Sequence, residues 1–75
     1  MFSVTGFNKA ATMGRPTAEK YCKDWSKDME ARGKDLTMQL KTGKIDKANY
    51  NRKRSQINAE VKDLNGCIQK VNKIS

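Results

Sequence analysis

The sequence predicts an all-α protein, a two-helix antiparallel hairpin preceded by an extended N-terminal arm. Apolar residues recur every three or four positions along two long stretches, which is the spacing of one helix face. A short segment with turn signals separates these stretches. The expected ranges are an extended arm over 1–15 and a hairpin over 16–75, with a helix over 17–42, a turn over 43–46 and a helix over 47–73.

The first long helix is expected to begin near Pro16, since proline suits the first turn of a helix. Thr17 is a candidate cap, and Glu19 adds a negative charge to the first turn. A helix of this range would be about 39 Å long. Gly33 lies on the inward stripe, which indicates either a close approach of the second helix or a local weakness or kink in the first. The stripe consists of Ala18, Cys22, Trp25, Met29, Gly33, Leu36 and Leu40.

The turn is indicated by Gly43 and Asp46. Glycine just after a helix accepts the positive φ that often ends it, and aspartate caps the free N–H groups of the next helix. A connection this short makes the two helices antiparallel neighbours.

The second long helix has a regular stripe whose tip end includes a charged residue. Arg54 occupies an inward position, where we expect its stem to lie on the core and its charge to reach solvent. The dipeptide Asn65-Gly66 falls on the outer face, so the helix is expected to continue through it. The stripe consists of Tyr50, Arg54, Ile57, Val61, Leu64, Ile68 and Val71.

The composition favours a partner. The chain has 75 residues, 16 Lys and Arg, 8 Asp and Glu, and a net charge of +8. So small a chain has a thin margin of stability, and its positive charge favours anionic partners. No stretch resembles a membrane span or a signal peptide. We therefore expect a cytoplasmic or virion-associated protein.

Catalytic and metal chemistry are not expected. With two cysteines and no histidine, the chain lacks both a zinc ligand set and a histidine base. Carboxylates alternate with cations as they do on solvated helix surfaces. Hence no catalytic residue, metal, cofactor or small-molecule substrate is predicted. Cys22 and Cys67 should lie at one height, either as a disulfide or as two reduced, small apolar residues; the lack of a secretory signal favours the reduced form.

The N-terminal arm has two interpretations, a frayed tail or an extended segment whose aromatic residues bind another chain. In the second interpretation the arm and the hairpin face together form a protein-binding surface. The shape resembles helical-hairpin subunits of bacterial secretion systems and small phage virion proteins in architecture alone. We expect a non-enzymatic assembly protein, a viral (phage) virion or accessory subunit, that binds a larger protein or copies of itself. The candidate contact residues are Phe2, Val4, Phe7, Trp25, Met29, Val61, Leu64 and Ile68.

The alternative function is nucleic-acid binding by the positively charged hairpin tip. Cations there can contact phosphates, and an aromatic ring among them can stack on a base. An acidic protein surface, or solvent alone, would suit the same charges. The candidate residues are Lys41, Lys44, Lys47, Tyr50, Arg52, Lys53 and Arg54.

Overall fold

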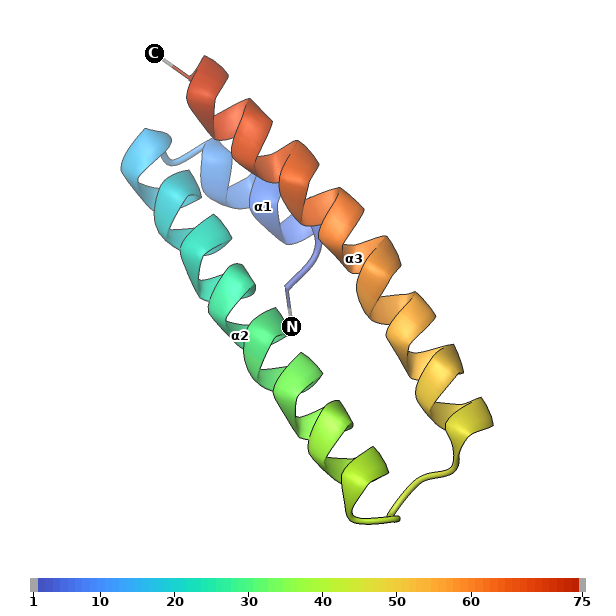
Figure 1. Ribbon diagram of the computed structural model, residues 1–75. Coiled ribbons are helices and arrows are strands. Elements are labelled where there is room, and N and C mark those ends of the chain that lie inside the picture. Colours follow the sequence, from blue (N-terminus) through green and yellow to red (C-terminus); the bar gives the residue numbers. More distant parts are fainter. Residues whose placement is uncertain (1, 75) are drawn as a thin grey trace.

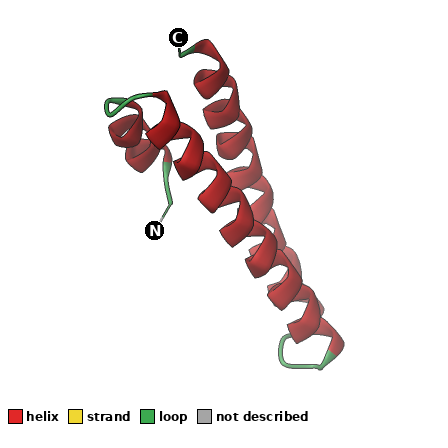
Figure 2. Cartoon of the chain, turned by 90° about the vertical axis from the view of Figure 1, so that its left-hand side faces the viewer, coloured by secondary structure: helices red, strands yellow, loops and turns green. Residues whose placement is uncertain are grey.

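The described part of the chain is an elongated bundle of three helices. The computed structural model describes residues 2–74, so the terminal positions of the two predicted ranges, 1 and 75, lie outside the described residues. Helix α1 spans Val4–Ala11, α2 spans Arg15–Lys41 and α3 spans Lys47–Lys73 (Figure 1). The described residues contain no strand (Figure 2). The all-α prediction is confirmed, but there are three helices where two were predicted.

The extended N-terminal arm was predicted wrongly, because most of it is helix α1. Ser3 is in an extended conformation, and its hydroxyl caps the helix by accepting a hydrogen bond from the Gly6 N–H at 3.0 Å. Phe7 and Ala10 are both buried on one side of this helix. The alternation of Phe2 and Val4 suggested a strand-like segment, whereas the step from Val4 to Phe7 also fits one face of a helix.

Helix α2 begins at Arg15, two residues before the predicted start. Gly14 has a φ of 110°, which reverses the chain direction after α1 at a conformation that favours glycine. Pro16 then lies in the first turn of α2 as expected. The side chain of Thr17 is not the cap, because the helix has already begun before it.

The turn at the tip has the predicted local chemistry. Gly43 has a φ of 75° and donates to the Leu40 carbonyl, while Lys44 donates to the Gln39 carbonyl, a pair of bonds that ends α2 as a Schellman motif. The Asp46 carboxylate accepts from the Asn49 N–H at 2.8 Å and so caps α3. Helix α3 has the bounds predicted for the second helix and continues through Asn65 and Gly66.

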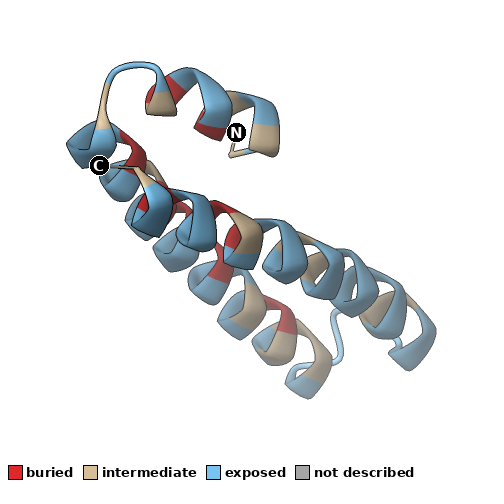
Figure 3. Cartoon of the chain, turned by 90° about the horizontal axis from the view of Figure 1, so that it is seen from above, coloured by how far each residue is buried: buried red, intermediate tan, exposed pale blue. Residues whose placement is uncertain are grey.

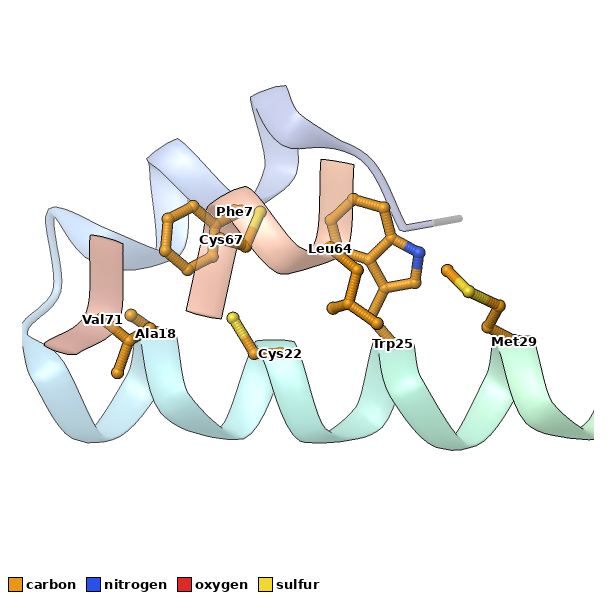
Figure 4. Close-up of a cluster of buried hydrophobic side chains, with 8 residues drawn as sticks. All are labelled: Phe7, Ala18, Cys22, Trp25, Met29, Leu64, Cys67 and Val71. Carbon is orange, nitrogen blue, oxygen red and sulfur yellow. The ribbon is translucent and has the colours of Figure 1, made fainter. Parts of the chain in front are cut away.

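The hydrophobic core lies at the open end of the hairpin, where α1 packs on both long helices. Figure 3 shows α1 on one face of the α2–α3 pair, with the buried residues between the elements. Towards the tip Leu36 is buried, but no residue of α3 between 47 and 63 is. Figure 4 shows the core cluster, Phe7, Ala18, Cys22, Trp25, Met29, Leu64, Cys67 and Val71.

Candidate protein-binding surface

Four of the eight predicted partner-contact residues lie inside the chain's own core. Phe7 and Trp25 are each 1% exposed, and Met29 and Leu64 are each 6% exposed. Sequence periodicity identified these side chains as inward-facing, but α1 covers the surface on which a partner was expected. The assignment of these four residues to a free contact surface is therefore corrected.

The aromatic residues of the N-terminal segment pack within the chain. The ring of Phe2 lies edge-on to that of Tyr21 at 5.2 Å between centroids and nearly parallel to that of Trp25 at 6.4 Å. Val4 is half-buried against the same cluster. The two candidate contact residues of this segment thus help to attach α1 to α2 of the same molecule.

The attachment is completed by Tyr21, whose hydroxyl makes two hydrogen bonds to the backbone of Ser3. It accepts from the Ser3 N–H at 2.9 Å and donates to the Ser3 carbonyl at 3.2 Å. Gly6 lies directly against this hydroxyl, and a Cβ at position 6 would overlap it. Absence of a side chain at Gly6 is therefore a condition for this docking.

Val61 and Ile68, the two remaining candidates, are exposed on α3. Their exposed fractions are 37% and 42%, and Met38 on α2 is 59% exposed. Val61 and Met38 line a groove of about 800 Å³ between α2 and α3. Ile68 borders a smaller hollow of about 260 Å³ farther toward the open end. These residues form the apolar surface that the fold leaves uncovered.

This groove lies on the side of the hairpin away from α1. Tyr21 contacts α1, whereas Glu30 lines the groove. The two residues are nine positions apart, which is about 2.5 helical turns, so their side chains point to opposite sides of α2. Gly33 also lines the groove, with the Arg54 guanidinium 3.6 Å from where its Cβ would be. The part of the second helix that comes close to Gly33 is thus the long side chain of Arg54, which is exposed as its charge requires.

Sequence reasoning missed the α2 wall of this groove. Ser26, Glu30, Gly33 and Thr37 line it at steps of three and four. Of these, Gly33 was part of the predicted inward stripe. The other three are polar, so a search for apolar stripes passed over them. Met38 was missed for a different reason, since it lies outside the main stripe.

The predicted tip cations are brought together at one end of the molecule, but not on one face. All six, Lys41, Lys44, Lys47, Arg52, Lys53 and Arg54, are exposed. None forms an ion pair with a carboxylate of residues 2–74. Successive helical residues differ by about 100° in direction. The three consecutive cations from Arg52 to Arg54 therefore surround α3, and Tyr50 is half-buried beside them.

The two cysteines lie together between α2 and α3 as free, buried thiols. Burial, together with the neighbouring Cys67, raises the pKa of Cys22 to about 11. Burial likewise raises the pKa of Cys67. Raised pKa values keep both thiols protonated at neutral pH, which suits core residues and not nucleophiles. Across residues 2–74 no group of three or more His, Cys, Asp or Glu side chains is placed to hold a metal ion.

Comparison with known protein families, curated proteins and solved structures finds no match to this chain. None of the three described helices is both long enough and apolar enough to cross a membrane. The function is therefore inferred from the chain's own residues.

Proposed function

We propose that this chain is a small, non-enzymatic assembly protein that binds another protein chain through the side of the hairpin away from α1. The virion or an accessory complex of a phage is the setting we propose for it. One observation carries the proposal. After α1 has completed the core, Met38, Val61 and Ile68 still expose apolar surface beside the groove and the smaller hollow.

The groove has the mixture of groups that protein interfaces use. Methionine side chains adapt their shape to a partner, and aliphatic side chains supply burial. Lys34 and Lys41 line the tip half of the groove, with Glu30 as the acidic group among its lining residues. A protein partner would bury the apolar centre and leave these charges at the rim, where they cost little desolvation.

The proposal is tested by photo-crosslinking from two exposed methionine positions. A benzophenone amino acid replaces Met38 in the groove, or Met13, which is 69% exposed in the α1–α2 connection. We expect one specific protein adduct from position 38 and none from position 13. The adduct must disappear when Val61→Glu is added to the position-38 chain. Equal adducts from both positions, or an adduct that survives Val61→Glu, would overturn the proposal.

A second candidate function is nucleic-acid binding, favoured by the six tip cations without a carboxylate partner in residues 2–74. If the tip binds phosphates, affinity for a 20-base-pair DNA probe should fall between 50 and 200 mM salt with a log–log slope of about −0.9 per phosphate contacted. Arg52→Glu with Arg54→Glu should reduce that slope by about 2. Lys20→Glu with Lys27→Glu, on exposed positions of α2, is the charge-matched control. Equal effects of both pairs would reject a site at the tip.

A further inference from the structure

Helix α3 carries a second heptad stripe on its exposed side. Four asparagines recur at intervals of seven residues, Asn51, Asn58, Asn65 and Asn72, and all four are exposed. Between them lie Arg54, Val61 and Ile68, which are also exposed. The steps along this set are 3, 4, 3, 4, 3 and 4. This alternation is the spacing by which one helix packs against another in a coiled coil. We call these seven residues the outer seam of α3.

The outer seam is free in the folded chain. Asn58 and Cys67 are nine residues apart, about 2.5 turns, so they point to opposite sides of α3. Cys67 is 2% exposed in the core. Helix α1 packs on the core side (Figure 3), and α2 contacts the stripe that contains Leu64 and Val71. Asn58 therefore points away from the core. The remaining seam residues are exposed as well, although Arg54, Val61, Ile68 and Asn72 border the groove and the smaller hollow beside α2.

The chemistry of the outer seam suits a copy of itself. A carboxamide both donates and accepts hydrogen bonds, so one asparagine can pair with another. Arg54 is the one charged residue among the seven seam residues, although 32% of the chain is Asp, Glu, Lys or Arg. Interface centres are depleted in charge in the same way. Val61 and Ile68 supply the apolar area that both copies would bury.

We propose that α3 pairs antiparallel with α3 of a second copy of this chain, through the outer seam and around a two-fold axis near Val61. This inference rests on the proposed function and names its partner. In this register Asn58 lies opposite Asn65 of the second copy, Asn51 lies opposite Asn72, and Val61 meets its own copy. Each contact occurs twice, as two-fold symmetry requires.

The charge distribution selects the antiparallel direction. In a parallel pair the two hairpin tips would lie side by side, each with six cations that form no ion pair in residues 2–74. Arg54 would also face Arg54. The antiparallel pair moves the tips to opposite ends of the dimer. With the axis near Val61 and a rise of about 1.5 Å per residue, even Arg54, the tip cation nearest the axis, is about 21 Å from its copy. At that separation salt screens their repulsion almost completely, since the Debye length is about 8 Å at physiological ionic strength.

The test is sedimentation equilibrium of the full reduced chain over a range of concentrations. We expect the mass to rise from 8.5 kDa towards twice that value. Asn58→Lys combined with Asn65→Glu leaves the net charge unchanged and sets opposite charges across the antiparallel seam, so the dimer should tighten by about tenfold. In a parallel seam the same pair would set like charges together and weaken the dimer.

A second double variant measures repulsion with a matched control. Asn58→Asp with Asn65→Asp places acids opposite acids and should weaken the dimer at least about tenfold. Gln56→Asp with Ala59→Asp adds the same charge at exposed positions outside the seam and should leave it nearly unchanged. Circular dichroism and Trp25 fluorescence confirm that each variant is folded.

Three results would overturn the inference. The first is a wild-type chain that stays monomeric at about millimolar concentration, which means a binding free energy weaker than roughly 4 kcal/mol. The second is a variant with Asn58→Lys and Asn65→Glu that dimerises no more tightly than the wild type. The third is an equal loss of dimer affinity from the two double variants with added aspartates. The crosslink from position 38 separates this failure from that of the proposed function. An adduct with a different protein would leave the proposed function standing while the self-pairing fails.

Discussion

Substitution of Gly6 by alanine tests how α1 is attached to the hairpin. A Cβ at position 6 would overlap the Tyr21 hydroxyl oxygen and come within 3.0 Å of Tyr21 Cζ. The phenol ring has little room to retreat, because the rings of Phe2, Phe7 and Trp25 surround it at centroid distances of 5.2, 6.3 and 6.1 Å. Gly6→Ala must therefore displace either Tyr21 or α1.

The expected loss follows from three contributions to the free energy of unfolding. Displacing Tyr21 breaks its two hydrogen bonds to the Ser3 backbone, each worth about 1 kcal/mol net. Overpacking a filled site costs about 1–3 kcal/mol. Alanine in place of glycine in a helix returns about 1 kcal/mol. The net prediction is that Gly6→Ala lowers the free energy of unfolding by about 2–4 kcal/mol.

Urea denaturation followed by the fluorescence of Trp25 measures this loss directly, since it is the chain's one tryptophan and lies in the core. Gly66→Ala is the matched control, because a Cβ there meets no atom within 4 Å, and it should raise stability by about 0.5–1 kcal/mol. In a Tyr21→Phe background the loss from Gly6→Ala should shrink by about 2 kcal/mol or more, because the overlapped hydroxyl and both of its hydrogen bonds are already gone. If Gly6→Ala is as stable as the wild type, α1 does not dock as described.

Three further changes have defined outcomes. The pKa of Cys22 is raised from 9.0 to about 11, so the protonated thiol stabilises the fold fully below pH 9, and roughly 2 kcal/mol of the free energy of unfolding should be lost as pH rises to 11. Cys22→Ala should reduce this loss, as measured by urea denaturation at several pH values across that range. If the variant and the wild type lose stability equally, the burial argument is wrong. Trp25→Phe should cost less than about 2 kcal/mol, because the indole N–H has no acceptor in residues 2–74; a loss above about 3 kcal/mol would show that the N–H is satisfied in solution. Asp46→Ala should lower the free energy of unfolding by about 1 kcal/mol, because it removes the N-cap of α3, whereas Asp63→Ala at an exposed position should lower it by less than about 0.5 kcal/mol. Equal losses from the two variants would show that Asp46 does not stabilise the helix as a cap.

Correcting the role of Trp25 changes how assembly should be tested. Trp25 was predicted to contact a partner, so its replacement by alanine would have been the obvious test of assembly. The Trp25 side chain lies in the core and is 1% exposed. Its truncation to alanine would therefore lower the free energy of unfolding by about 3–5 kcal/mol and would remove any surface activity indirectly. Val61 and the outer seam of α3 are the appropriate positions, because changes there leave the core intact.

The two long helices and the turn between them could be predicted from the amino-acid sequence alone. Their signals are local: a repeating apolar stripe, a glycine that takes a positive φ at position 43, and a capping carboxylate at Asp46. Each acts within one or two helical turns, so none needs knowledge of the rest of the fold. The shared height of Cys22 and Cys67 then followed from the geometry of a short antiparallel connection.

The conformation of residues 4–11, and the identity of the apolar side chains that stay free, depend on how the helices pack against one another. A helix of eight residues with a glycine in its first turn is unstable alone, because nucleation costs more than so few hydrogen bonds return. It forms here because Phe7 and Ala10 are buried against the hairpin and Tyr21 holds Ser3. An apolar stripe shows which side of a helix avoids water, but the element that covers it comes from elsewhere in the chain. For that reason Phe7 and Trp25 belong to the core, while Val61 and Ile68 remain exposed.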